Sequence, residues 1–159
     1  MHLTLEELIA YTDEERAKWE RWFAAHGERP LALPLPGGSH PSVGALVLHI
    51  FGPESQYLQF LRGDELTNYT TRPTDRAGAL FEFGREARER TRAFVASARP
   101  EDWSRTVEPR EEFPVSARKI VAHVLLHEIR HWAQIAAAVR AHGLAPPGDH
   151  DLLFSHALK

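Results

Sequence analysis

The sequence predicts an all-α fold: a four-helix bundle with long loops and a short C-terminal helix, in a single domain covering residues 1–159. Two observations support this prediction. Apolar residues recur at the spacing of an α-helix in four long segments, and stretches rich in proline and glycine separate these segments. With 159 residues, of which 43% are hydrophobic and 26% charged, the chain is large enough to bury a core of its own.

The first helix is predicted to begin at Thr4 and to end near His26 and Gly27. Thr4 and Glu7 form the pattern of a capping box, in which the hydroxyl and the carboxylate each accept a free backbone N–H. Glycine suits the position at which a helix stops. The stretch Arg29–Pro41 holds four prolines and two adjacent glycines, so we expect a surface loop there.

The second helix is predicted to start after Ser42, which suits an N-cap, and to continue through Leu61. Gly52 and Pro53 fall inside it. Proline removes a backbone hydrogen bond and clashes with the preceding turn, so we expect a kink at this point. Residues 63–73 are expected to form a polar loop.

The third helix is predicted to start at Thr74 or Asp75 and to run to about Ala98, with a charged outer face. The connector at residues 103–113 is ambiguous, and a short hairpin between Thr106–Val107 and Phe113 is one reading of it.

The fourth helix is predicted from about Ser116 to His142 and is followed by Gly143. It is apolar on most sides, which is typical of a helix at the centre of its bundle. After a Pro-Pro break, residues 149–158 are expected to form a last short helix.

Composition narrows the possible functions. A net charge of -3 gives no basic surface for nucleic acid. The chain contains no cysteine, which excludes disulfides, zinc–thiolate sites and a cysteine nucleophile. No apolar run is long enough to span a bilayer, and the N-terminus is too polar for a secretory signal. We therefore expect a cytoplasmic protein that binds neither nucleic acid nor membrane.

The unusual feature is a set of ten histidines. His127 and His131 are four residues apart in the fourth helix, so their rings point from the same face. Two imidazoles at that spacing can hold one divalent metal ion. His49 lies in the second helix between two apolar residues, where a histidine must either hydrogen-bond in the core or bind something. The sequence therefore predicts a metal site with His49, His127 and His131 as ligands.

Several neighbours of this site need a separate interpretation. His123 lies one turn before His127, and we expect it beside the site and outside the ligand set. Gln134 can reach the same face and form a hydrogen bond there, or it can make a helix–helix contact. The remaining histidines are interpreted as surface residues or as partners of the helix dipole at C-terminal ends. They are His2, His26, His40, His142, His150 and His156.

Residues 127–131 also match the motif H-E-x-x-H of zinc peptidases, in which the glutamate is the general base. The rest of the chain does not support a peptidase. The extended motif is missing, since Gln134 and Ala137 stand at its later positions, and no glutamate follows Glu128. Glu128 is then expected either to face solvent or to be a loose neighbour of the site.

With these residues identified, the chain resembles the DinB-like superfamily of four-helix-bundle metalloproteins. The resemblance rests on Ser42 to Ile50 with its histidine, on H-x-x-x-H followed by Gln134, and on the tail from Gly143 through two prolines to Asp149. The chain departs from the family pattern at Trp132, where arginine is usual.

The resemblance implies a fold of the DinB-like type and a divalent metal ion, usually zinc or nickel, held by three histidines and water. It also implies a thiol S-transferase that uses a low-molecular-weight thiol and a small-molecule substrate. The alternatives are a hydrolase that uses metal-bound hydroxide and a non-catalytic stress-response or binding protein with a structural metal. Many such proteins are dimers, and the apolar residues Trp19, Trp22 and Phe23 of the first helix also favour a homodimer.

Overall fold

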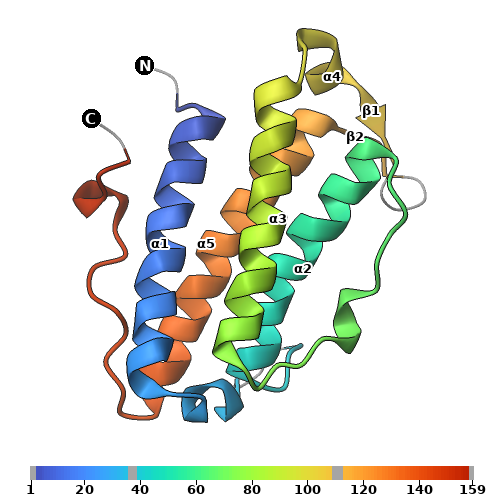
Figure 1. Cartoon of the computed structure of the whole chain (residues 1–159). Coiled ribbons are helices and arrows are strands. Elements are labelled where there is room, and N and C mark those ends of the chain that lie inside the picture. Colours follow the sequence, from blue (N-terminus) through green and yellow to red (C-terminus); the bar gives the residue numbers. More distant parts are fainter. Residues whose placement is uncertain (1–2, 36–38, 109–112, 158–159) are drawn as a thin grey trace.

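Four long helices make up the molecule, which confirms the predicted all-α bundle. The computed structural model describes residues 3–35, 39–108 and 113–157. The long helices are α1 (Leu5–His26), α2 (Val43–Arg62), α3 (Ala77–Ser97) and α5 (Ala117–Ala141) (Figure 1). Among the described residues, no helix is long and apolar enough to cross a membrane.

The helices do not simply alternate in direction. α1 and α5 run one way through the bundle, and α2 and α3 run the other way (Figure 1). α2 and α3 are consecutive yet parallel because residues 63–76 carry the chain back from one end of the bundle to the other. Contacts between the helices place them in the cyclic order α1, α3, α2, α5. α2 and α5 are therefore antiparallel neighbours.

The helix starts follow from local hydrogen bonds, with one exception. The Thr4–Glu7 capping box is formed, and the hydroxyls of Ser42 and Ser116 accept backbone N–H groups at the starts of α2 and α5. α3 starts a little later than predicted. Its first N–H, at Ala77, donates to the Glu28 carboxylate at 2.7 Å. This cap comes from a residue 49 positions away, so no local pattern reveals it.

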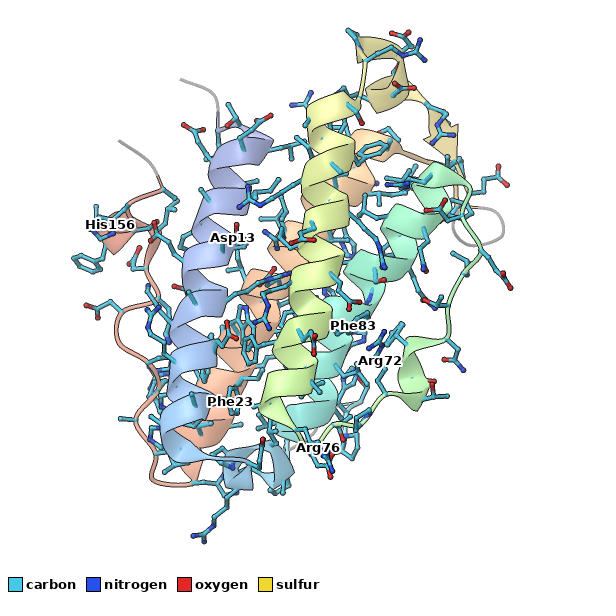
Figure 2. All side chains as sticks on the ribbon, in the orientation of Figure 1. Asp13, Phe23, Arg72, Arg76, Phe83 and His156 are labelled. Atoms are coloured by element: carbon cyan, nitrogen blue, oxygen red, sulfur yellow. The ribbon has the colours of Figure 1, made fainter. Side chains whose placement is uncertain are left out.

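α2 continues through Gly52 and Pro53 without interruption. Gly52 is required for a packing reason. A Cβ atom at this position would lie 2.2 Å from the ring of Tyr69, which belongs to the 3-10 turn η2 (Tyr69–Thr71) in the crossover. The crossover is also held to α3 by Arg72, whose guanidinium carbon lies 4.1 Å from the centre of the Phe83 ring (Figure 2).

The connections differ most from the sequence-based expectations. The expected surface loop begins with the 3-10 turn η1 (Arg29–Ala32), in which Pro30 and Leu31 are buried. These two residues pack beneath α2 as part of the core edge, so the expectation of a surface loop is wrong for them. A short helix not foreseen from the sequence, α4 (Pro100–Ser104), follows α3.

The predicted hairpin exists with a different partner strand. β1 (Thr106–Val107) pairs antiparallel with β2 (Val115–Ser116), and Phe113 lies before β2 with 60% of its surface exposed. The buried residue that anchors the hairpin is Val115. The expected C-terminal helix is reduced to the 3-10 turn η3 (Leu152–Phe154), and Leu158 lies outside the described residues.

The core explains the aromatic residues of α1. Trp19 stacks on Trp132 of α5 with ring centres 5.4 Å apart, and Phe23 contacts Phe81 of α3. Trp19 and Phe23 are at most 1% exposed and Trp22 is 6% exposed. These side chains belong to the core of their own chain, so they provide no surface for self-association, and that argument for a dimer is wrong.

Candidate metal centre

α2 and α5 bring three imidazoles together in the groove between them. His49 comes from α2, and His127 and His131 come from successive turns of α5. The Nε2 atom of His127 lies 3.2 Å from Nε2 of His49 and 3.0 Å from Nε2 of His131. Among the described residues, these three histidines are the only group of metal-ligating side chains arranged closely enough to hold an ion.

The spacing of these nitrogens suits a metal ion. Zinc binds histidine nitrogen at about 2.0–2.1 Å in tetrahedral geometry, which places two ligand nitrogens about 3.3–3.4 Å apart. The two observed separations are within a few tenths of an ångström of that value. The predicted residues can therefore hold a divalent ion with little movement.

The electrostatic environment keeps the three rings neutral, as metal ligands must be. Burial lowers the pKa of His49 to about 4, with a further contribution from the charges of His40 and His131. Burial and the neighbouring His131 and His49 lower the pKa of His127 to about 3. Burial also lowers the pKa of His131, against the opposing effect of a hydrogen bond to Gln134.

That hydrogen bond determines which nitrogen of His131 faces the site. Nδ1 of His131 lies 2.6 Å from Oε1 of Gln134. The amide oxygen can only accept, so Nδ1 carries the proton and Nε2 presents its lone pair. Partners of this kind fix the orientation of metal-binding imidazoles. Of the two roles considered for Gln134, the structure supports the hydrogen bond at the site.

His123 lies beside the group and does not join it. Its ring centre is 5.4 Å from that of His127 and 6.0 Å from that of Tyr57. This agrees with its predicted position.

His40 and His150 are not the simple surface residues that the sequence suggested. The ring centre of His40 lies 4.1 Å from that of His49, so His40 covers the metal centre from the loop before α2. Nδ1 of His150 lies 2.5 Å from a carboxylate oxygen of the buried Glu15. His150 also stacks on Trp19, because the C-terminal segment folds back along α1 (Figure 1).

The other histidines agree better with the first interpretation. His26 and His142 lie at the ends of α1 and α5, where each bonds a backbone carbonyl one turn earlier. His156 is exposed on the C-terminal segment (Figure 2). His2 lies outside the described residues.

A pocket of about 310 Å³ borders the histidine group at His131. His131, Gln134 and His40 belong to its lining. Leu35, Leu46 and two alanines of α5 supply apolar walls, and Arg130 lies at its side. No sequence pattern assigned a role to Arg130. Helical spacing could have indicated that Arg130 lies beside the site, because residue 130 is three positions after His127 and four before Gln134.

Glu128 occupies a place that the sequence did not predict. It neither faces solvent nor neighbours the metal centre; it is fully buried at the axis of the bundle. Its carboxylate binds Arg16 of α1 at 2.6 Å and Arg88 of α3 at 2.6 Å, and it accepts the indole N–H of Trp132 at 3.0 Å. A buried carboxylate requires such partners. Glu128 therefore points toward the two arginines, and both expectations, that it faces solvent or is a loose neighbour of the site, are wrong.

These contacts also remove the peptidase reading of the H-E-x-x-H motif. A general base must reach the water or substrate at the metal. Among the described residues, the Glu128 side chain bonds to Arg16, Arg88 and Trp132 and to none of the three histidines. Trp132 likewise bonds to Glu128 rather than to the histidine group, so the departure from the usual arginine lies outside the metal centre.

Comparison with known proteins agrees with the geometry. Residues 34–135 match the model of the DinB superfamily, a segment that covers well over half of the chain and includes all three histidines. The chain therefore belongs to the DinB superfamily, as its motifs indicated. No curated protein matches it.

Proposed function

We propose that the protein binds one divalent metal ion, zinc or nickel, through His49, His127 and His131, and that it catalyses transfer of a low-molecular-weight thiol to a small-molecule substrate. When bound, such an ion supplies Lewis-acid chemistry, favouring the deprotonated form of a thiol or water molecule. The chain has no cysteine, so the thiol must come from solution.

The observation that carries this proposal is the pocket at the histidine group. A structural metal site is closed by protein ligands, whereas a catalytic site keeps a position open. Only three ligating side chains converge among the described residues, and the pocket of about 310 Å³ borders one of them. This arrangement favours an enzyme over a protein with a structural metal.

The surrounding residues have definable roles in such a reaction. Gln134 holds the ring of His131 with Nε2 toward the centre. Leu35 and Leu46 limit water around a bound substrate. The neutral imidazoles leave the full charge of the ion uncompensated, which strengthens its effect on a bound nucleophile. We further propose a homodimer, because the family resemblance favours it and two-fold dimers are the commonest soluble oligomers.

A hydrolase that uses water as nucleophile is the second candidate, since the same open position and pocket would serve it. The two differ in one requirement. A transferase needs an added thiol, whereas a hydrolase acts on an ester or amide without it.

Cobalt substitution tests the proposal directly. Adding a small thiol to the cobalt protein should produce a sulfur-to-cobalt charge-transfer band, and His49→Ala should remove or strongly alter it. A cobalt spectrum that ignores thiol, azide and other small anions would indicate a closed site and would rule out both enzyme functions. Turnover of an ester without thiol would support the hydrolase instead.

A further inference from the structure

One wall of the pocket is a single face of α5. Arg130, Gln134, Ala137 and Ala138 follow the spacing i, i+4, i+7 and i+8, which aligns side chains along one side of a helix. The polar members lie nearest the histidine group and the alanines lie further along. Along α5 the pocket lining is therefore polar beside the histidines and apolar further along the helix.

The charged side chain in the described lining of this pocket is positive. Arg130 is exposed on the surface of α5, and none of the described residues that line the pocket is a carboxylate. In the part of the chain that the structure describes, no ion pair involves Arg130 or the other arginines of α5, and Arg130 differs from Arg118 in that it lines the pocket beside the histidines. The guanidinium of Arg130 is thus free to bind an anion from solution.

The position of Arg130 relates that anion to the metal centre. Arg130 precedes His131 directly and lies one turn after His127, and its charge acts on both rings. A molecule held by Arg130 would therefore place its other atoms at the open side of the histidine group. The volume of about 310 Å³ is at the small end of the range for ligand pockets.

We propose that the substrate pocket selects a small carboxylate with a short apolar body, and that Arg130 is the residue that recognises its carboxylate. The planar guanidinium can form two parallel hydrogen bonds to a carboxylate. Leu35, Leu46 and Ala138 contact the apolar part of the molecule. This inference rests on the proposed function, because it assigns the substrate class of the same site.

A pair of thiols of matched length tests it. 3-Mercaptopropionate and 3-mercaptopropionamide present the same sulfur and differ in the charge at the far end. Titrated against the cobalt protein, the carboxylate should bind about tenfold more tightly than the amide, as expected for one charge-assisted hydrogen-bonded pair. The preference should decrease as salt is added, because Arg130 is exposed.

Arg130→Gln should abolish this preference while metal content stays at the parental level. Arg118→Gln is the matched control, since Arg118 is also exposed on α5 but lies outside the pocket lining; it should retain the preference. Arg130→Lys should keep part of it. Equal affinity for the two thiols in the parent protein, or an unchanged preference in Arg130→Gln, would overturn the inference.

A second titration separates this inference from the proposed function. Calorimetry of the zinc protein with butyrate and butyramide reports the charge preference without any thiol. If thiols give no charge-transfer band but butyrate is preferred through Arg130, the thiol-transferase proposal fails and the carboxylate pocket remains. If the band forms equally with both thiols and butyrate has no advantage, the pocket proposal fails and the transferase remains.

Discussion

At the scale of single residues, the candidate metal centre depends on which nitrogen each imidazole presents. A free histidine exchanges between two tautomers, and only one of them directs a lone pair toward the other rings. Gln134 removes this freedom for His131, because its amide oxygen accepts a hydrogen bond from Nδ1–H. Pre-orientation of this kind lowers the cost of ordering the ligands when an ion binds.

Gln134→Leu should therefore weaken metal binding by about 10- to 100-fold without unfolding the protein. Competition with a chromophoric chelator measures the affinity. Gln56→Leu is a suitable control, because the Gln56 amide also forms a side-chain hydrogen bond, donated to the exposed carbonyl of Thr67. An unchanged affinity in Gln134→Leu would mean that the hydrogen bond has no part in binding.

The position of His123 leads to a second residue-scale prediction. Its ring contacts His127 but lies outside the group that can hold an ion. His123→Ala should keep about one divalent ion per chain, whereas His127→Ala should lose it. Metal analysis of protein purified without a histidine tag gives the stoichiometry. Equal loss in the two variants would make His123 a ligand.

At the scale of elements, each long helix contributes one charged side chain to the bundle axis. Arg16 of α1 and Arg88 of α3 alternate with Glu54 of α2 and Glu128 of α5. All four are buried and together carry no net charge. The ion pairs of such a cluster only partly offset the free energy needed to remove its charges from water. A buried charge left without a partner destabilises the folded state far more. The arrangement favours one register of the helices over others.

Glu128→Gln should destabilise the protein by about 3–5 kcal/mol, because it leaves buried Arg16 with Glu54 alone and buried Arg88 with Glu54 and the partly exposed Asp13. Chemical denaturation at neutral pH measures the change. Glu20→Gln serves as the matched control, since Glu20 forms an exposed pair with Arg85 and should cost at most about 1 kcal/mol. Similar costs for the two variants would contradict a structural role for the cluster.

The same cluster predicts how stability depends on pH. Burial alone would raise the pKa of Glu54, but the charges of Arg16 and Arg88 lower it from an ordinary value of 4.5 to about 2. The folded state then binds fewer protons than the unfolded state. The stability from Glu54 is present above pH 4.5 and is lost as the pH falls toward 2.

Urea denaturation between pH 6 and pH 2 should therefore show a steeper acid loss of stability in the parent than in Glu54→Gln. The variant should be less stable at pH 6, and the difference between the two proteins should shrink as the pH falls. Parallel profiles would mean that Glu54 does not contribute through its charge.

At the scale of the whole molecule, the aromatic residues of α1 are buried in the core of their own chain. A dimer must therefore use another surface than the one the sequence suggested. We still expect a two-fold dimer, because this is the commonest assembly of soluble proteins and the family resemblance favours it. Light scattering at micromolar concentration should report twice the chain mass of 18.0 kDa, and a monomer alone would refute the prediction.

The sequence by itself determined the four long helices and the three candidate metal ligands. Helical spacing of apolar residues, the caps at Thr4 and Ser42 and the stop at Gly143 are local signals, because backbone hydrogen bonds within a helix connect residues a few positions apart. The spacing of His127 and His131 is local for the same reason. His49 was identified from its apolar neighbours and from the family motif.

Only the tertiary structure decided how distant residues pair. The inward position of Arg16 on α1 was a weak signal for the buried cluster, but nothing in the sequence connects it with Glu128, 112 positions later. The placement of His40 over the centre, the cap of α3 by Glu28 and the free charge of Arg130 were equally hidden. These features depend on which helices are neighbours. Local patterns allow several arrangements of the helices, and burial selects among them, because a buried charge or hydrogen-bond donor without a partner is unfavourable.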